Sequence, residues 1–259
     1  SGTFGNVIDD QGLDGHMKQG DFSDFKDAGT YYIQTPSGEK TYEFTIGDGV
    51  LEDAYADAVK MLYLQRCGTE TTEDIAGDFA HGVCHDTEAT VYGTNKKMDV
   101  SGGRHDAGDY GRYVVPGAKT VQDLFLAYED YHEERDDLGI PESGNGIPDV
   151  LDEARWELDW MLKMQDASGG VYHKVTCANF PETVGPVDET DELIVCPIST
   201  TATGDFAAVM AKAAVLYNEM DPDFAATARA AAKKAYDYCK DLDDNDGFKN
   251  PEDIATGEY

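Results

Sequence analysis

Residues 51–66 read LEDAYADAVKMLYLQR, and this stretch marks where the chain changes from a strand-like to a helical pattern. Its apolar side chains return every three or four residues, a spacing that places them on one face of an α-helix. They are Leu51, Ala54, Tyr55, Val59, Leu62 and Tyr63. We therefore expect a helix here and a helical domain over residues 49–259.

The same spacing recurs four times toward the C-terminus. The predicted helices cover residues 117–134, 148–165, 205–220 and 224–239. The last two are rich in alanine, which favours close packing of neighbouring helices. Five helices separated by long, glycine-rich polar loops predict an all-α domain, and loops of that length are usually functional.

The segment before residue 49 has a different pattern. Residues 30–35 and 40–46 are rich in β-branched and aromatic side chains, and Pro36-Ser37-Gly38 between them is a turn signal. This pattern predicts a hairpin. Because a lone hairpin is marginal in water, residues 1–48 are interpreted as the C-terminal part of a small β-sandwich.

Charge limits the classes of partner. The 52 acidic and 20 basic residues give a net charge of −32. Such a chain repels phosphate backbones and anionic membrane surfaces, so neither nucleic acid nor membrane is an expected partner. A neutral sugar meets no such penalty, and dense carboxylates suit calcium. A merely solvated surface explains the charge equally well. The sequence has no apolar run long enough for a transmembrane helix, and residues 1–4 do not begin a signal peptide.

Residues 99–111, DVSGGRHDAGDYG, are the segment richest in chemistry. Asp106 and Asp109 lie three positions apart among glycines, which allow sharp turns and close approach of a ligand. Two carboxylates held together can orient a water molecule, and the ionised one can accept its proton. Hydrolysis of a glycosidic bond with inversion requires such a base. An Asx-rich turn or a calcium loop would show the same spacing.

Residues 102–111 resemble the catalytic-base signature of glycoside hydrolase family 9, G-G-W-[YH]-D-A-G-D-[YF]-G-K. Further segments resemble the family in the same order, at residues 63–68, 83–85, 143–153, 170–175 and 199–208. The resemblance covers about residues 50–259. It implies an (α/α)6 barrel, of which about the first half is present, and inverting hydrolysis of β-1,4-glucans such as cellulose and cellodextrins. The preceding hairpin resembles the end of an immunoglobulin-like module.

The resemblance also assigns roles to individual residues. Asp109 would be the general base, and Asp106 would help it to hold the water. His173 and Tyr172 would line the sugar cleft, and Tyr110 is a further candidate for stacking on a sugar.

Two departures from the family pattern affect these assignments. Arg104 stands where the family usually has tryptophan, so either the sugar-binding surface or the packing of the loop is expected to differ there. The family's general acid is a glutamate near the end of the complete domain, and Glu252 and Glu258 lie in a different sequence context. The acid and the rest of the catalytic domain are therefore expected downstream. Half a barrel alone should be inactive and poorly stable, because its inner helix faces are exposed.

Two thiols and two imidazoles, from Cys67, Cys84, His85 and His105, form a set suited to tetrahedral zinc. Their spacing is not that of a zinc finger, and two buried cysteines with two ordinary histidines fit the spacing as well. The resemblance implies a structural zinc, because one branch of the family carries it on such residues. That zinc would pin the loop that follows His105. His81 is a reserve ligand.

A second metal site is expected ahead of the helix at 148–165. Glu142, Asn145, Asp149 and Asp152 offer oxygen ligands around glycines, which suits calcium. A turn followed by a helix N-terminus that favours acids explains the pattern equally well. The resemblance supports calcium. Residues 243–247, DDNDG, open like an EF-hand loop but are interpreted as a solvated acidic turn.

Three further alternatives stay open at the level of sequence. Cys177 and Cys196 flank an acidic loop and could pair in a disulfide, which spacing alone does not settle. A non-catalytic carbohydrate- or metal-binding module competes with the hydrolase, and a zinc-dependent hydrolase is a third reading. The resemblance implies a secreted or extracellular protein.

Overall fold

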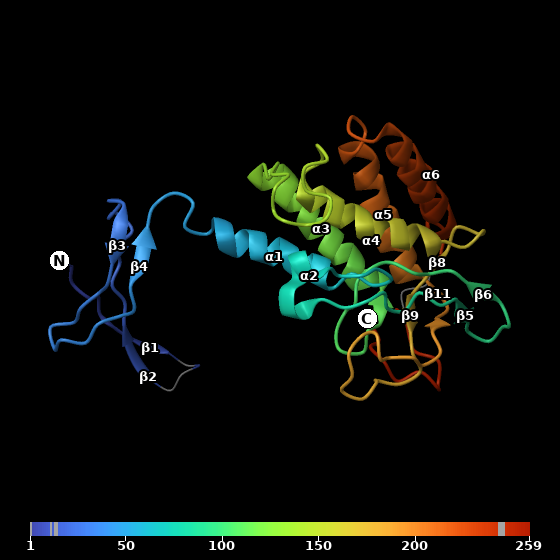
Figure 1. Cartoon of the computed structure of the whole chain (residues 1–259), viewed down its shortest axis with the longest axis horizontal. Coiled ribbons are helices and arrows are strands. Elements are labelled where there is room, and N and C mark those ends of the chain that lie inside the picture. The colour runs from blue at the N-terminus through green and yellow to red at the C-terminus, as the bar shows by residue number, and fades with distance from the viewer. Residues whose placement is uncertain (1, 11, 13–14, 243–246) are drawn as a thin grey trace. The chain divides into compact units, whose positions relative to one another are not determined.

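The computed structural model of the chain describes residues 2–10, 12, 15–242 and 247–259 (Figure 1). Two compact units are present, one ending at Tyr55 and the other running from Ala56 to Tyr259. Most of the acidic turn predicted at residues 243–247 lies outside the described residues.

The N-terminal unit holds two antiparallel strand pairs. They are β1 (Val7–Asp10) with β2 (Gly15–Lys18), and β3 (Gly29–Tyr31) with β4 (Phe44–Ile46). The second pair is the predicted hairpin, because Gln34 and Lys40 link its arms again around the turn at residues 35–39. The sequence does not predict the first pair, since its strands, VIDD and GHMK, carry few of the side chains that favour strands.

All five predicted helices are present. They are α1 (Glu52–Leu64), α3 (Val114–Tyr131), α4 (Asp149–Lys163), α5 (Thr200–Leu216) and α6 (Pro222–Cys239), together with the short α2 (Glu73–Ala76) and a 3-10 turn, η1 (Gly77–Phe79). Helix α5 begins earlier than predicted because the Ser199 side chain caps it, accepting the Ala202 N–H. Asp221 caps α6 by accepting the Phe224 N–H.

Helices α3 to α6 form the core of the larger unit. Helix α5 packs against α6 and α3, and α3 packs against α4 (Figure 1). The largest fully buried apolar side chains come mainly from these helices and include Trp160, Phe125, Leu151, Leu158, Met161 and Phe206. Among the described residues, no helix is both long enough and apolar enough to cross a membrane.

The larger unit also contains a small sheet, so the expectation of a domain built from helices alone is wrong in this respect. The strands are β5 (Ala89–Val91), β6 (Lys97–Met98), β7 (Arg112–Tyr113), β9 (Lys174–Thr176) and β10 (Ile194–Val195), in the order β6-β5-β10-β9-β7. A separate pair joins β8 (Val171–Tyr172) to β11 (Ile198–Ser199). Strands of two or three residues are too short to show an alternating pattern.

This sheet brings together three loops that are distant in sequence. Strand β7 follows the loop at residues 99–111 that holds Asp106 and Asp109, called the carboxylate loop below. It pairs antiparallel with β9, and Tyr113 lies opposite Lys174. Strand β10 pairs with β9 on one side and with β5 on the other. The segment before β5, the carboxylate loop and the loop between β9 and β10 therefore meet at one place.

Candidate active site and metal centres

The carboxylate loop, residues 99–111, is held against α4 by two tryptophans. The Trp156 indole N–H donates to the Gly103 carbonyl at 2.9 Å. A Cβ added at Gly103 would lie 2.7 Å from the ring of Trp160, which is 1% exposed. The φ of Gly103 is 75°, in the left-handed region that favours glycine. Backbone conformation and packing therefore both require glycine at this position.

Asp109 lies in the interior of the loop, with only 4% of its surface exposed. Its carboxylate accepts the Tyr113 hydroxyl at 2.5 Å and the Gly111 N–H at 3.3 Å. It forms no ion pair with any residue that the structure describes. Burial, reinforced by the bond to Asp109, raises the pKa of Tyr113, so this hydroxyl stays protonated and remains a donor. A carboxylate that is held by neutral donors and forms no ion pair is suited to act as a base.

Asp106 is exposed and borders a cleft of about 240 Å³ that Tyr113 also lines. Its carboxylate accepts the Tyr259 hydroxyl at 2.7 Å. That hydrogen bond raises the pKa of Tyr259 to about 12. The rings of Tyr113 and Tyr259 meet edge to face, with centroids 4.8 Å apart. The two carboxylates are thus held by two tyrosines that touch each other, and the sequence did not predict this role for either tyrosine.

A buried lysine fixes the segment that carries Tyr259. Lys174 is fully buried, and its ammonium donates to the Asn250 side-chain oxygen at 2.7 Å and to the Gly257 carbonyl at 2.5 Å. Burial lowers the pKa of Lys174. Because Lys174 lies opposite Tyr113 in the sheet, the C-terminal segment is tied to the strand that ends the carboxylate loop.

His173 and Tyr172, which the resemblance assigns to the sugar cleft, are buried. His173 is 0% exposed, its Nδ1 lies 2.8 Å from the Ser199 hydroxyl, and its ring stacks on Phe248 with centroids 3.7 Å apart. Burial lowers the pKa of His173 to about 4. Its Nε2 has no hydrogen-bond partner among the described residues. Contact of these two side chains with a sugar stays a prediction.

Arg104 borders the same cleft as Asp106, but its guanidinium faces α4. It forms ion pairs with Glu153 and with Glu157, the latter at 3.4 Å, and is 8% exposed. Burial raises the pKa of Glu157 to about 7. The residue that replaces the family's tryptophan therefore fastens the loop to a helix, and a direct role in sugar binding stays a prediction.

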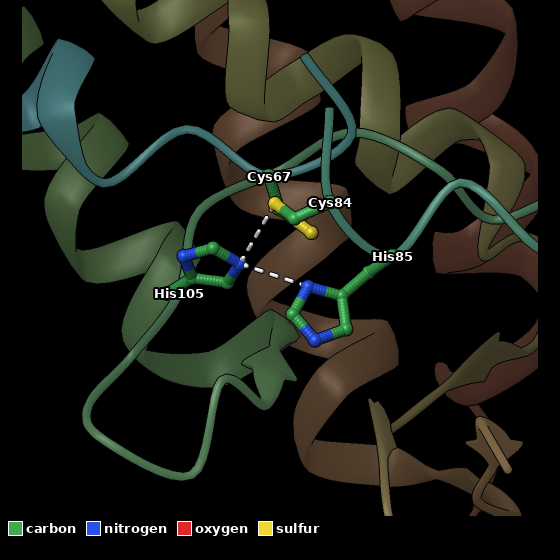
Figure 2. A group of neighbouring side chains, drawn as sticks. All are labelled: Cys67, Cys84, His85 and His105. Carbon is green, nitrogen blue, oxygen red and sulfur yellow. Dashed lines mark hydrogen bonds between the residues drawn. The ribbon is translucent and has the colours of Figure 1, made fainter. Parts of the chain in front are cut away.

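The four predicted zinc ligands converge from three segments, as Figure 2 shows. One ligand atom from each of Cys67, Cys84, His85 and His105 lies within 4.8 Å of every other. His105 Nε2 is 3.3 Å from His85 Nδ1 and 3.6 Å from the Cys84 sulfur. Tetrahedral zinc with ordinary bond lengths separates two nitrogens by roughly 3.3 Å, and a nitrogen from a sulfur by roughly 3.6 Å. The donor set and its spacing therefore fit zinc.

Two members of this cluster, Cys84 and His105, have the protonation state that binds a metal. Burial raises the pKa of Cys67 well above its ordinary value, whereas the hydrogen bond with Cys67 lowers the pKa of Cys84 to about 2. Burial lowers the pKa of His105. One thiolate and a neutral imidazole are the forms that bind zinc. The reserve ligand, His81, lies outside the group, with its Nδ1 2.7 Å from the Gly82 carbonyl.

Tyr110 packs on this cluster. Its ring centroid lies 5.6 Å from that of His85 and 5.1 Å from that of His105. Its hydroxyl donates to the Val184 carbonyl at 2.5 Å. Tyr110 therefore links the carboxylate loop to the loop between β9 and β10, and its predicted stacking on a sugar is untested.

The predicted calcium ligands only partly come together. Asp149 and Asp152 group with Asp136, which was not among the predicted ligands, and their ligand atoms lie within 4.8 Å of one another. Glu142 instead forms an ion pair with Arg66 at 2.9 Å. The Asn145 amide donates to Asp152 at 3.1 Å, so the amide nitrogen, rather than a ligand oxygen, points at the group.

Buried carboxylates in this group have few donors to offset their charge. Asp149 is fully buried, and its Oδ1 has no hydrogen-bond partner among the described residues. Burial raises the pKa of Asp149 and raises that of Asp152 to about 6. A cation would neutralise these carboxylates, and all-oxygen ligands favour calcium.

Cys177 and Cys196 are both buried free thiols in this structure. The Cys177 thiol donates instead to the Glu189 carboxylate at 3.1 Å. Glu189 was not predicted as a functional residue, because it is one acid among many in its loop and no spacing relates it to the cluster.

Comparison with known proteins identifies the family of the chain. The family model "Glycosyl hydrolase family 9" matches residues 52–259. Endoglucanase D of Acetivibrio thermocellus is 41% identical over 247 residues, which cover 92% of this chain and 39% of that protein. The chain thus spans less than half the length of this relative.

Solved structures give the same result. A metagenome-derived glycoside hydrolase family 9 endoglucanase is 34% identical, with a TM-score of 0.90 over 99% of this chain and 48% of that one. A zinc-binding triple mutant of the family 9 endoglucanase J30 is 32% identical, with a TM-score of 0.86 over 92% of this chain and 46% of that one. The helices described above therefore form part of an (α/α) fold, and the chain belongs to glycosyl hydrolase family 9.

Proposed function

We propose that the protein hydrolyses β-1,4-glucosidic bonds in cellulose, cellodextrins or related β-glucans with inversion of configuration. One observation carries this proposal. Two carboxylates in a glycine-lined loop, Asp106 and Asp109, are each held by a tyrosine hydroxyl, and Asp106 and Tyr113 line a cleft. Family membership and the name of the endoglucanase relative support the substrate class.

The two carboxylates would have different roles. Asp109 would take the proton from the attacking water, and the donors from Tyr113 and Gly111 would keep its oxygens aimed. Asp106, which is exposed to the cleft, would hold the water from the other side. A glutamic acid outside this chain would protonate the leaving oxygen across the sugar.

Substituting each carboxylate in the full protein tests this assignment. Asp109→Ala should abolish the release of reducing ends from a soluble β-1,4-glucan, and Asp106→Ala should reduce it strongly. Asp123→Ala, which removes an exposed acid of α3 paired with Lys119, is the matched control and should retain activity. Unimpaired turnover by Asp109→Ala would remove the base assignment.

We propose that Cys67, Cys84, His85 and His105 hold a structural zinc. With four protein ligands the ion has no open position, so when bound it supplies cross-linking of the chain and no chemistry on substrate. His105 directly precedes Asp106, so the centre would fix the middle of the carboxylate loop, immediately before the two aspartates. The J30 variant, named as zinc-binding, supports a zinc site in this fold.

We propose that Asp136, Asp149 and Asp152 hold a structural calcium. Support comes from their convergence and from the buried Asp149 Oδ1, which has no hydrogen-bond partner in the part of the chain that the structure describes. This set differs from the predicted one, in which Glu142 and Asn145 were also ligands.

Three broader expectations complete the proposal. The helices would be the first half of an (α/α)6 barrel completed downstream, since relatives of known structure extend beyond the matched region. Residues 1–48 would be the end of an immunoglobulin-like module preceding the catalytic domain at 49–259. The protein would act outside the cell, because polymeric glucans do not cross membranes.

A further inference from the structure

The loop between β9 and β10 carries a buried carboxylate that faces the back of the zinc cluster. Glu189 is 7% exposed. Its Oε2 lies 3.2 Å from His85 Nε2, and the two side chains are 2% and 3% exposed. Its Oε1 accepts the Asp191 N–H at 2.7 Å. Among the residues that the structure describes, His85 is its one ion-pair partner, so no Lys or Arg accounts for burying this acid.

The geometry around His85 fixes the position of a proton. A carboxylate accepts, so His85 Nε2 must carry the hydrogen that Glu189 receives. The other ring nitrogen, Nδ1, then presents its lone pair, and it faces His105 Nε2 at 3.3 Å. Glu189 lies across the imidazole from the four ligand atoms and is not one of them.

We propose that Glu189 is a positioning residue of the zinc centre, which selects the metal-binding tautomer of His85 and holds its ring in the orientation that presents Nδ1 to the other ligands. This inference rests on the proposed zinc site. A carboxylate behind a metal-bound histidine commonly changes metal affinity by about 10- to 100-fold. The main-chain conformation of His85 adds to the need for such an anchor, because its φ of 47° is unusual for a residue other than glycine.

The same contacts join the zinc centre to a whole loop. The Glu189 carboxylate also accepts the Cys177 thiol, at the start of the loop between β9 and β10. Tyr110, which packs on both imidazoles, donates to the Val184 carbonyl within that loop. Zinc would therefore order residues 178–191 as well as the carboxylate loop.

Zinc affinity measured by competition with a chromophoric chelator tests the proposal without any need for catalysis. Glu189→Gln keeps a hydrogen-bond acceptor but loses the charge, so zinc should bind roughly 10-fold more weakly, and Glu189→Ala should bind more weakly still. Glu192→Gln is the matched control. It removes the charge of a 65% exposed side chain in the same loop that pairs with Lys97, and its affinity should match the wild type.

The outcomes separate the two hypotheses. If the wild-type protein takes up no zinc, the zinc site itself is wrong. If the wild type binds one zinc and both Glu189 variants bind it within twofold, the zinc site stands and the role of Glu189 is overturned. Far-UV circular dichroism of the metal-free variants identifies any that fail to fold, and Glu189→Gln, which preserves shape, then decides.

Hydrogen exchange gives a second readout that a purely local packing role would not change. Zinc should slow amide exchange in residues 178–191 of the wild type and of Glu192→Gln. In Glu189→Ala this zinc-dependent protection should be lost, while residues 102–111 are still protected once enough zinc is added. Equal protection of residues 178–191 in Glu189→Ala would contradict the proposed link.

Discussion

Asp106 and Asp109 of the carboxylate loop each accept a hydrogen bond from a different tyrosine, and the two carboxylates differ in how deeply they are buried. Asp109 is 4% exposed and is held by Tyr113, whereas Asp106 faces the cleft and is held by Tyr259. Neutral donors hold the buried Asp109 carboxylate in a fixed direction without an ion pair. At the scale of single residues, the proposed chemistry therefore depends on these hydroxyl groups as much as on the acids.

Removing the hydroxyl that holds Asp109 tests this view. Tyr113→Phe should lower kcat/KM of the full protein by about 10- to 100-fold, because a hydrogen bond to a charged group contributes about 1.5–3 kcal/mol. Steady-state kinetics on a soluble β-1,4-glucan measures the effect. Tyr131→Phe, at the end of the helix that follows Tyr113 and 82% exposed, is the control. Equal activity of both variants would show that the hydroxyl does not position the base.

His173 should make stability depend on pH. Burial holds its pKa at about 4 in the folded protein, against about 6.5 in an unfolded chain. In the unfolded chain this histidine therefore binds a proton below pH 6.5, whereas in the folded protein it binds one only below about pH 4. The part of the free energy of unfolding that depends on neutral His173 is fully present above pH 6.5. It falls as the pH drops toward 4, by on the order of 3 kcal/mol.

Thermal melts at pH 7.5 and 5 measure this dependence. His173→Asn should lower Tm at pH 7.5 but reduce the further loss between the two pH values. His132→Asn replaces an exposed histidine at the end of α3 and should keep the wild-type loss. A His173→Asn protein with an unchanged loss would show that this histidine is not the source.

How far sequence predicts the site depends on the residue type. Cysteine and histidine are rare in this chain, so Cys67, Cys84, His85 and His105 stand out by composition alone, and all four converge. Glu189 and Asp136 do not stand out, because they are two of 52 acids. Only the folded structure distinguishes them. The loop between β9 and β10 places Glu189 beside His85, and the turn before α4 places Asp136 beside Asp149.

Among elements, the carboxylate loop depends on how it meets α4. Gly103→Ala should destabilise the protein by at least about 2 kcal/mol. The substitution forces an alanine into the left-handed backbone conformation, and its Cβ clashes with the ring of Trp160. Gly108→Ala is the control, since nothing lies within 4 Å of its added Cβ. Urea unfolding of both variants gives the comparison. Equal midpoints would mean that the loop is not packed on α4 as described.

The turn ahead of α4 should respond to calcium. Calcium at 100 times its Kd should raise Tm by roughly 5–10 °C at pH 7, and a chelator should reverse the rise. Asp136→Asn should abolish most of it, whereas Asp137→Asn, which replaces the exposed neighbour, should leave it nearly intact. Calorimetric scans with and without calcium measure both. A full calcium response in Asp136→Asn would restore the predicted ligands Glu142 and Asn145 as candidates.

The elements also show where periodicity succeeds and fails. Long helices such as α1 and α4 repeat their apolar spacing several times, so their existence follows from sequence. Strands β7 and β10 contain two residues each, and no repeat fits within them. Their pairing is set by tertiary contacts, which is why the sheet that assembles the site was not predicted.

For the whole molecule, the alanine-rich faces of α5 and α6 are informative. They line a groove of about 520 Å³, with Ala207, Ala211, Ala214, Ala232 and Tyr236 among its walls. Small side chains allow helices to approach closely. This face fits the proposal that further helices of the same barrel pack here, and the relatives have the additional length to supply them.

The configuration of the first product tests the central claim most directly. Proton NMR can follow the anomeric signal of the sugar released by the full protein in the first minutes, before mutarotation. If Asp109 activates water, the β-linked substrate should yield the α-anomer first. Initial release of the β-anomer would require a carboxylate nucleophile instead, and would contradict the role assigned to Asp109.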